Sequence, residues 1–395
     1  GQRSDPAGKT TWCGVRPYRG HVKPARSYPA GKFKKGVLLV ALTGLDIFKL
    51  LPKTNCGECG VPTCMAFAMK IAARQAQIDL CPYVSDEVKE QLSEAAAAPV
   101  KKITIGVGSD ALTIGEETVL FRHEKTFVHP PGLGVLISDD LTNAEIEAKV
   151  AQALAASFER VEQQLKVRVI AIKAGSSADR FAEVISLINS KASLPLILIA
   201  NDTAVLQKGL EIVKDKKPLV YLKSGSVADI AALAKQYSLP VVIEGNSLEE
   251  LSQRSEEAAS AGVKEIVLAP ITSSPKETLK ALVYARRAAI KKKFKPLGYP
   301  VLTMPVNETD NPQLQTTLAC LYVAKYGGLI ILPDADPAAV LPILVLSQNI
   351  YTDPQKPMQM SQGIYPIGEP KEGSPVLITT NFSLTYFIVS GEIEG

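Results

Sequence analysis

Four of the six cysteines of this chain lie close together, in Cys56-Gly-Glu-Cys59-Gly-Val-Pro-Thr-Cys64 and, sixteen residues further on, in Cys81-Pro82. Thiolates separated by two residues can bind neighbouring positions of one metal centre, and the intervening glycines let backbone amides turn toward the sulfurs. Six cysteines in 395 residues are too few for a disulfide scaffold. The spacing therefore predicts a metal centre held by Cys56, Cys59, Cys64 and Cys81.

Four thiolates suit either a 4Fe-4S cluster or a structural zinc ion, so the number of ligands does not distinguish the two. Zinc ribbons usually have two C-x2-C pairs. This chain has one such pair, extended by a C-x4-C step and closed by a distant Cys-Pro, which also occurs in ferredoxin motifs. We therefore expect a 4Fe-4S cluster, with zinc as the alternative. The remaining cysteines are Cys320, expected to be a small buried hydrophobe in an apolar helix, and Cys13.

Other patterns that would indicate chemistry are missing from the sequence. None of the three histidines has a partner at a metal-ligand spacing, so we expect structural or surface roles for His21, His123 and His129. The chain has no G-x-S-x-G elbow, P-loop or H-E-x-x-H motif. No residue is therefore assigned a catalytic role.

Charge and hydropathy exclude several classes of partner. Lysine and arginine total 44 against 40 aspartates and glutamates, a net charge of +4, and they are scattered, so we expect no nucleic-acid groove. No apolar run reaches the roughly 18 to 20 residues that cross a bilayer, and the first residues lack a signal-peptide pattern. These features predict a cytoplasmic protein without a membrane partner. A length of 395 residues with 46% hydrophobic residues predicts two or three domains.

Residues 1–39 differ from the rest of the chain because they are rich in Pro, Gly, Lys and Arg and have no apolar period. A purine-rich ribosome-binding sequence can encode residues 34–37, the alternative start codon GTG can encode Val40, and the chain opens with Gly1. We therefore interpret residues 1–39 as a non-native leader, with a disordered tail as the alternative.

The cysteines lie in residues 40–98, where the apolar spacing predicts short helices: LDIFKLL before the first cysteine, MAFAMKIAARQAQ between the third and fourth, and SDEVKEQLSEAAAA after the last. We expect this segment to be a small cluster domain. Residues 99–362 are expected to begin with a β-hairpin, ITIGVG at 103–108 and TVLF at 118–121, and to continue as one larger α/β domain.

Eight short apolar runs dominate that larger domain. Each is rich in β-branched residues and hydrophobic on both faces, as a buried parallel strand is, and each precedes an amphipathic stretch such as NAEIEAKVAQALAASF. Eight such units predict a TIM (β/α)8 barrel. A doubly wound sheet is the alternative, but no G-x-G-x-x-G follows the first run. The runs begin at residues 134, 169, 194, 218, 240, 265, 300 and 329.

Charged residues follow several of these runs. In a barrel enzyme, groups at the carboxyl ends of the strands supply the chemistry, although the same residues can equally cap loops. No pair among them has a spacing that specifies a mechanism. They are Asp139, Asp140, Lys173, Lys223, Glu244 and Asp334.

Residues 363–395 carry two further β-rich runs in SPVLITTNFSLTYFIVSGEIEG and then stop. A sheet begun there has few partner strands. We interpret this segment as the truncated start of a further domain.

Five stretches resemble one family, the large (gamma) subunit of the corrinoid iron-sulfur protein in the acetyl-CoA decarbonylase/synthase system. They are LTGLDIFKLLPKTNCGECGVPTCMAFAMKIA, CPYVSDEVKEQL, LFRHEKTF, IYTDPQKP and TTNFSLTYF, and the likeness runs from about Leu42 to the end. The resemblance implies an N-terminal 4Fe-4S domain, a TIM barrel, and a C-terminal domain that holds a cobalamin-type corrinoid. In the family that last domain extends further than Gly395.

The resemblance also implies corrinoid-dependent methyl transfer in the reductive acetyl-CoA (Wood-Ljungdahl) pathway, as a methyltransferase subunit. The corrinoid cobalt, as Co(I), would take a methyl group from methyltetrahydropterin through a partner methyltransferase and pass it to acetyl-CoA synthase. The cluster on the four cysteines would return inactive Co(II) to Co(I), and a small subunit would complete a heterodimer. By the same resemblance, corrinoid contacts are expected at Thr379, Thr380, Asn381 and Ser383.

Two other functions stay open on the sequence alone. A ferredoxin-like electron carrier would use the barrel only as a docking surface and would bind no corrinoid. A TIM-barrel enzyme with a structural zinc domain would need polar groups at its strand ends. The polar residues of TTNFS suit an edge strand as well as a corrinoid site.

Overall fold

The computed structural model describes residues 44–72, 75–76, 78–85, 88–89, 98–160, 163–352, 363–380 and 382–394. These residues all belong to one of two compact units, Leu38–Gly395. The leader predicted for residues 1–39, and Asn381, lie outside the described residues. The division into domains at 98 and 362 stays a prediction.

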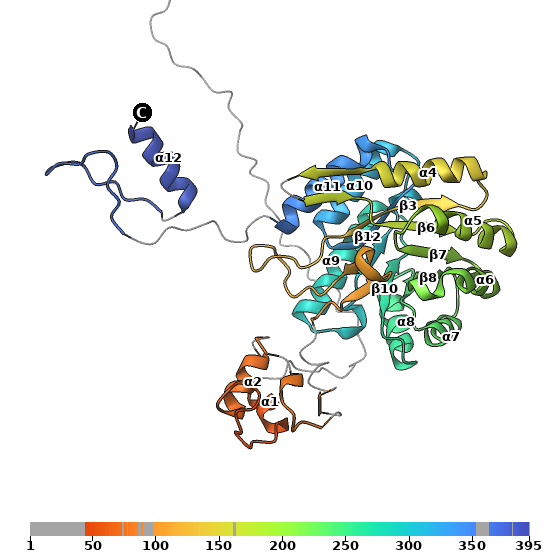
Figure 1. Ribbon diagram of the computed structural model, residues 1–395, viewed down its shortest axis with the longest axis horizontal. Helices are drawn as coiled ribbons and strands as arrows, with labels where there is room; N and C mark the ends of the chain where they lie inside the picture. Colours follow the sequence, from red (N-terminus) through yellow and green to blue (C-terminus); the bar gives the residue numbers. More distant parts are fainter. Residues whose placement is uncertain are drawn as a thin grey trace, which may run out of the picture. The chain divides into compact units, whose positions relative to one another are not determined.

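The cysteine-rich segment folds as short helices around a small core of its own, drawn in orange and red in Figure 1. Helix α1 spans Gly44–Leu50, helix α2 spans Cys64–Ala72, and a single 3₁₀ turn, η1, spans Ile78–Leu80. Apolar residues of α1 and α2, including Ile47 and Phe67, are buried in this core. The first two predicted helices are therefore confirmed, although the second ends at Ala72, and the third, over residues 85–98, lies mostly outside the described residues.

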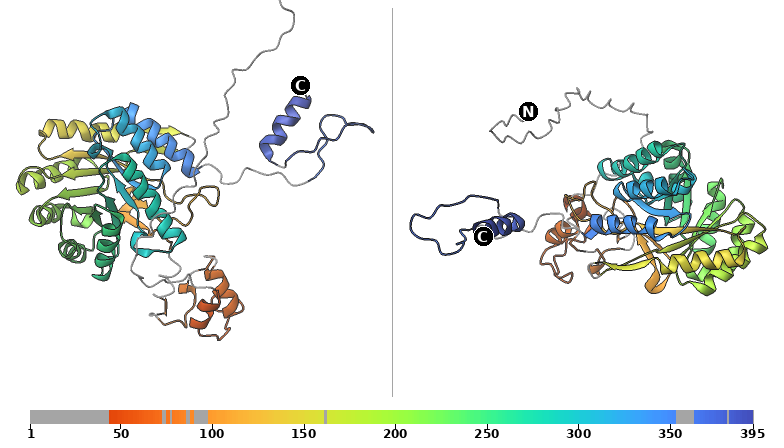
Figure 2. Two further views of the ribbon diagram at one scale, coloured as in Figure 1. Left: turned by 180° about the vertical axis from the view of Figure 1, so that it is seen from behind. Right: turned by 90° about the horizontal axis from the view of Figure 1, so that it is seen from above.

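A closed barrel of eight parallel strands forms the larger part, with strand order β10-β11-β12-β3-β6-β7-β8-β9. Figures 1 and 2 show its helices packed around the outside of the strands. All eight apolar runs form barrel strands, which confirms the TIM barrel. The strands are β3 Gly132–Ser138, β6 Val169–Lys173, β7 Leu196–Ala200, β8 Leu219–Leu222, β9 Val241–Gly245, β10 Ile266–Pro270, β11 Val301–Thr303 and β12 Gly327–Leu332.

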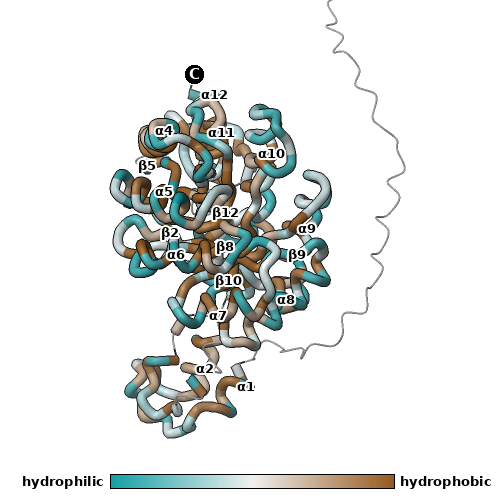
Figure 3. Tube along the Cα trace, turned by 90° about the vertical axis from the view of Figure 1, so that its right-hand side faces the viewer, coloured by the Kyte–Doolittle hydropathy of each residue, from teal (hydrophilic) through white to brown (hydrophobic). Residues whose placement is uncertain are grey.

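The strands are hydrophobic on both faces because each face is buried against a different core. In β6, Val169 and Ala171 belong to the core inside the barrel, whereas Ile170 and Ile172 belong to the core between strands and helices. In Figure 3 the tube is largely brown, that is hydrophobic, in the middle of the barrel, and teal stretches alternate with brown ones around it. This two-sided burial gives parallel strands their continuous apolar runs.

Eight helices cover the barrel, and most begin at a side chain that caps the first turn. Thr142 forms a full capping box with Glu145, and Ser177, Asp202 and Ser247 each accept a hydrogen bond from a first-turn amide. The helices are α4 Asn143–Ala155, α5 Ala178–Lys191, α6 Thr203–Val213, α7 Val227–Tyr237, α8 Leu248–Ser260, α9 Pro275–Lys291, α10 Pro312–Ala324 and α11 Pro337–Thr352.

A β-hairpin closes the end of the barrel at which the strands begin. Its strands are β1 Ile103–Ile105 and β2 Leu112–Ile114, and their apolar side chains join the core inside the barrel. Gly106 N donates to Lys217 O, just before β8. The prediction of the second strand at 118–121 is wrong. The chain reverses earlier, at Gly106 and Gly108, which both have positive φ, so β2 pairs with β1 and residues 118–121 lie outside the hairpin.

Two further sequence predictions are corrected by the structure. The helical stretch expected to run to Phe158 ends at Ala155, and an antiparallel ribbon follows, β4 Ser157–Arg160 and β5 Gln163–Lys166. Long-range contacts hold the ribbon: Gln348 of α11 donates to Arg160 O at 2.7 Å. The last part of the tail, expected to be a strand, is helix α12, Ser383–Glu394. No partner strand pairs with it among the described residues, and a helix satisfies its backbone groups internally.

A buried ion pair joins the chain after the hairpin to the outer helices. The carboxylate of Glu117 and the guanidinium of Arg286, on α9, are 2.9 Å apart with side chains only 6% and 7% exposed. Arg286 also donates to Val119 O and lies between the rings of Phe127 and Tyr326. Glu117 accepts a second hydrogen bond from the backbone of residue 128. This pair therefore fixes the segment between hairpin and barrel.

We expect Glu117→Ala to lower the free energy of unfolding of the barrel by about 3–5 kcal/mol, because it leaves the Arg286 charge buried without its partner. The control is Glu277→Ala, which breaks an exposed pair with Lys280 and should cost no more than about 1 kcal/mol. Denaturant unfolding followed by far-ultraviolet circular dichroism measures both. Equal losses in the two variants would contradict this role.

Candidate metal centre

The four cysteines are brought into one small domain from three pieces of chain. Cys64 opens helix α2, Cys81 follows η1, and Cys56 and Cys59 lie in the loop before α2. Cys64 and Cys81 are buried within the core of this domain, Cys59 packs against it, and Cys56 is exposed. All four are free thiols. Three of the four predicted ligands therefore lie in or against one small core, and Cys56 lies exposed in the loop that also carries Cys59.

The loop that carries Cys56 and Cys59 has an unusual backbone. Asn55, Gly57 and Gly60 have φ values of 48°, 78° and 77°, in the left-handed region that glycine adopts most readily. A β-carbon at Gly57 or Gly60 would meet no atom within 4 Å, so both positions face open space. The two glycines are thus needed for the conformation of the loop and not because a side chain there would clash.

Helix α2 is fixed at the end that carries Cys64. The side chain of Asn55 accepts a hydrogen bond from Cys64 N at 2.8 Å, and Thr63 accepts one from Ala66 N at 3.1 Å. These bonds satisfy amides that a helix leaves unpaired in its first turn. They also tie the cysteine loop to the helix, at the end of the helix dipole that favours negative charge.

A second contact ties the loop to the last cysteine. The hydroxyl of Tyr83, two residues after Cys81, donates to the carboxylate of Glu58 at 2.7 Å. This hydrogen bond raises the pKa of the Tyr83 phenol, and the charges of Glu58, Cys56 and Cys81 raise it further. Tyr83 and Glu58 therefore lie within electrostatic range of cysteines from both segments. Sequence reasoning did not identify either residue, because neither is a metal-ligand type in a ligand spacing.

Four thiolates are the donor set of a 4Fe-4S cluster, in which each sulfur binds a different iron. The same donor set also suits a structural zinc ion. In the part of the chain that the structure describes, no three His, Cys, Asp or Glu side chains are grouped closely enough to hold a metal ion.

Two of the histidines take the structural roles expected of them. His123 stacks on Phe121, with ring centroids 5.5 Å apart, and His129 contacts Glu116 at 2.8 Å. This contact is the main reason why the pKa of the Glu116 carboxyl is lowered. His21 lies outside the described residues.

The polar residues at the carboxyl ends of the barrel strands mostly cap loops. Asp139 is buried and accepts hydrogen bonds from Gly175 N and Ser176 N, at 2.8 and 2.9 Å. Asp334 accepts one from Asp336 N. Asp140 and Lys173 are exposed, and no described contact brings them to the buried carboxylates.

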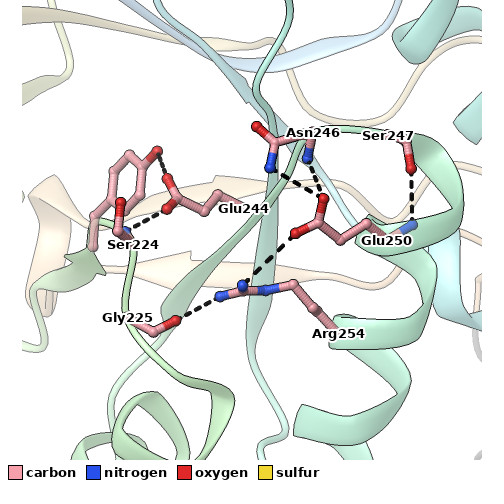
Figure 4. Close-up of polar contacts among 8 residues, drawn as sticks. Ser224, Gly225, Glu244, Asn246, Ser247, Glu250 and Arg254 are labelled. Carbon is pink, nitrogen blue, oxygen red and sulfur yellow. Dashed lines mark hydrogen bonds and ion pairs between the residues drawn. The ribbon is translucent and has the colours of Figure 1, made fainter.

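Glu244 is likewise held by its own neighbours (Figure 4). It accepts hydrogen bonds from the hydroxyl of Tyr221, at 2.6 Å, and from Ser224 N, next to Lys223. Figure 4 also shows Arg254 reaching toward Gly225 and Glu250, so the loops after β8 and β9 are joined by polar contacts. The contacts of Glu244 and Arg254 therefore hold the loop after β8 against β9 and α8.

One carboxyl group at this end of the barrel was not identified from the sequence. Glu308 accepts hydrogen bonds from the buried Tyr322, at 2.6 Å, and from Thr278, at 3.2 Å. It lines a cavity of about 80 Å³ together with Tyr221 and Thr303. Burial raises the pKa of the Glu308 carboxyl above its ordinary value of 4.5. The surrounding sequence reads as a turn, so nothing in it marks this residue.

We expect Glu308→Gln to change how stability depends on pH. The folded-state pKa of Glu308 is raised, so its contribution to stability is complete below the unfolded value of about 4.5 and is lost as pH rises through the folded value. The amide variant does not ionise, so it should gain stability relative to the wild type as pH rises from about 4.5 toward neutrality. Denaturation midpoints at several pH values measure this. Parallel profiles for the two proteins would contradict it.

The expected corrinoid contacts lie in a segment with no core of its own. Thr379 and Thr380 are exposed, Thr380 contacts Thr385 at 3.2 Å, and Ser383 opens helix α12. Asn381 lies outside the described residues. No described side chain between 363 and 394 is buried, so these residues alone enclose no space for a macrocycle. They do not fit a complete corrinoid site by themselves.

Two family models match the chain. Residues 102–395 match the family described as CdhD, CO dehydrogenase/acetyl-CoA synthase delta subunit. Residues 51–83, which contain the four cysteines, match the family described as "Putative Fe-S cluster". None of the described helices has the length and apolar character needed to cross a membrane.

Two relatives are similar along most of the chain. The corrinoid/iron-sulfur protein large subunit of Moorella thermoacetica is 41% identical over 356 residues, covering 90% of this chain and 79% of that protein. The acetyl-CoA decarbonylase/synthase complex subunit gamma of Methanocaldococcus jannaschii is 33% identical, covering 89% and 78%. Among solved structures, dihydropteroate synthase of Xanthomonas albilineans has a TM-score of 0.45 at 16% identity, covering 64% of this chain and 100% of that one.

Proposed function

This chain belongs to the CdhD family and is homologous to corrinoid/iron-sulfur protein large subunits, and on that premise we propose that it carries methyl groups within an acetyl-CoA decarbonylase/synthase complex. The observation that carries the proposal is the 41% identity over 90% of the chain to a protein of that name. The cysteine domain supports it independently, because Cys64 and Cys81 are buried in its small core, Cys59 packs against that core, and Cys56 lies in the same loop as Cys59.

We assign the cluster to Cys56, Cys59, Cys64 and Cys81. A bound 4Fe-4S cluster supplies single electrons at low potential, which would return an oxidised corrinoid to its methyl-accepting state. Cys64 and Cys81, being buried in the domain core, fix the position of the group. Cys56, being exposed, leaves one side open to an electron donor or acceptor.

The proposed route of the methyl group runs from methyltetrahydropterin, through a partner methyltransferase, to acetyl-CoA synthase in the reductive acetyl-CoA pathway. A small subunit would form a heterodimer with this chain in the cytoplasm and complete the corrinoid site that Thr379, Thr380, Asn381 and Ser383 begin. The barrel would serve as a binding scaffold. Its buried carboxylates agree with this role, because Asp139 and Glu244 accept hydrogen bonds from the loops beside them.

A ferredoxin-like electron carrier is the second candidate. It is favoured by one observation, that the described residues between 363 and 394 enclose no space for a corrinoid. Such a protein would bind the cluster and no cobalt. The two candidates therefore differ in cofactor content.

An anaerobic preparation of the full chain, assayed for iron, sulfide, zinc and cobalt with and without added corrinoid, tests the proposal. Electron paramagnetic resonance after reduction should show a reduced 4Fe-4S cluster with about four irons per chain. Retention of corrinoid, by the chain alone or with its small subunit, supports methyl transfer. A cluster without corrinoid under both conditions supports the electron carrier, and zinc without iron overturns both.

We expect Cys59→Ser to remove most of the bound iron while leaving the barrel folded. The serine hydroxyl is a poor substitute for a thiolate, and the cysteine domain has a core separate from those of the barrel. Iron analysis and far-ultraviolet circular dichroism measure the two effects. The matched control, Cys320→Ser on α10, should keep the wild-type iron content, and loss of barrel signal in Cys59→Ser would contradict the separation.

A further inference from the structure

A side-chain hydrogen bond joins the two chain segments that carry the proposed cluster ligands. Glu58 lies between Cys56 and Cys59, and Tyr83 lies two residues after Cys81. The Tyr83 hydroxyl donates to the Glu58 carboxylate at 2.7 Å, across 25 positions of sequence. The contact therefore holds a carboxylate at the place where the two segments meet.

The position of this carboxylate is electrostatically significant. The Tyr83 phenol lies within range of the charges on Cys56 and Cys81, and Glu58 is bonded directly to it. Cys56 is exposed and Glu58 follows it by two residues, so the carboxylate stands at the open side of the site. A negative charge at such a place disfavours the arrival of an electron on a cluster.

Tyr83 gives the carboxylate a fixed position. Glu58 is exposed, and an unattached glutamate side chain would move freely in water, where its interactions are screened. A tyrosine phenol keeps its proton at neutral pH, so Tyr83 remains a hydrogen-bond donor to the carboxylate there. Tyr83 itself is 55% exposed, so packing alone does not explain its position.

We propose that Glu58, positioned by Tyr83, lowers the reduction potential of the cluster that the four cysteines hold. This inference rests on the proposed function and deepens it, because a cluster that reactivates a corrinoid must donate electrons at low potential. The step affected is the uptake of one electron from an external one-electron donor, with no covalent bond made or broken. Tyr83 is a positioning residue, because it acts through Glu58. Glu58 acts through its charge, and neither residue binds iron.

The test is a reductive titration of the full chain with its cluster, followed by electron paramagnetic resonance. We expect Glu58→Gln to raise the midpoint potential, increasing the ratio of reduced to oxidised cluster about three- to tenfold at a fixed potential. A tenfold change corresponds to 59 mV for a one-electron couple. Glutamine keeps an oxygen for the Tyr83 hydrogen bond, so this variant removes charge and preserves the contact.

Asp46→Asn is the matched control. It removes the same charge from the same domain, but Asp46 lies on α1, where it pairs with Lys49 at 3.1 Å. Its ratio of reduced to oxidised cluster should change less than twofold. Equal shifts in Asp46→Asn and Glu58→Gln would overturn the inference, because they would show an effect of net charge alone.

Tyr83→Phe separates positioning from a general loosening of the loop. It should raise the potential less than Glu58→Gln does, and it should add little in the Glu58→Gln background, because it acts through the carboxylate. Iron content, measured in each variant, should stay at the wild-type value. A full additional shift in the double variant, or loss of iron in Tyr83→Phe, would show that Tyr83 has a separate structural role and would overturn the pairing.

Different results would overturn the proposed function and the role of Glu58. A wild-type chain with no iron-sulfur signal would overturn both the proposed function and this inference. A wild-type cluster whose midpoint potential is the same in Glu58→Gln would overturn this inference alone and leave the cluster assignment standing.

Discussion

Two of the proposed cluster ligands are part of the hydrophobic core of the domain that holds them, and the rest of the site depends on that constraint. Cys64 and Cys81 are buried beside Phe67 and Ile71. A segment this short buries little apolar surface, so metal binding and folding are expected to be coupled in it. The exposed part of the loop can then vary in conformation without moving the two buried sulfurs.

The loop around these fixed points is shaped by a few local bonds. Asn55 holds the start of helix α2, and the left-handed glycines turn the chain past Cys56 and Cys59. The Tyr83–Glu58 bond then links the loop to the distant cysteine segment. The Asn55 bond therefore holds the backbone at Cys64, and the Tyr83–Glu58 bond connects the loop of Cys56 and Cys59 to the segment of Cys81.

The barrel is built on a different principle, because its stability comes from closure. Every strand is buried on both faces, the hairpin fills the end where the strands begin, and the Glu117–Arg286 pair fixes the connection between them. At the opposite end, polar groups such as Glu244 are satisfied by neighbouring loops. A scaffold whose carboxylates accept hydrogen bonds from their own loops suits a subunit that binds partners, which agrees with the family to which the chain belongs.

The amino-acid sequence was sufficient to predict the eight barrel strands and the four candidate ligands, because both are visible in local patterns. A strand that is buried on both faces has a continuous apolar run, and the spacing of the cysteines follows directly from their residue numbers. Other features became visible only in the three-dimensional structure. They are the second strand of the hairpin, the β4–β5 ribbon, helix α12, the buried Glu308 and the Tyr83–Glu58 bond. Most of these features depend on contacts with segments that are distant in the sequence. The ribbon, for example, is held where Gln348 donates a hydrogen bond to Arg160 O. Local residue preferences carry no information about such partners.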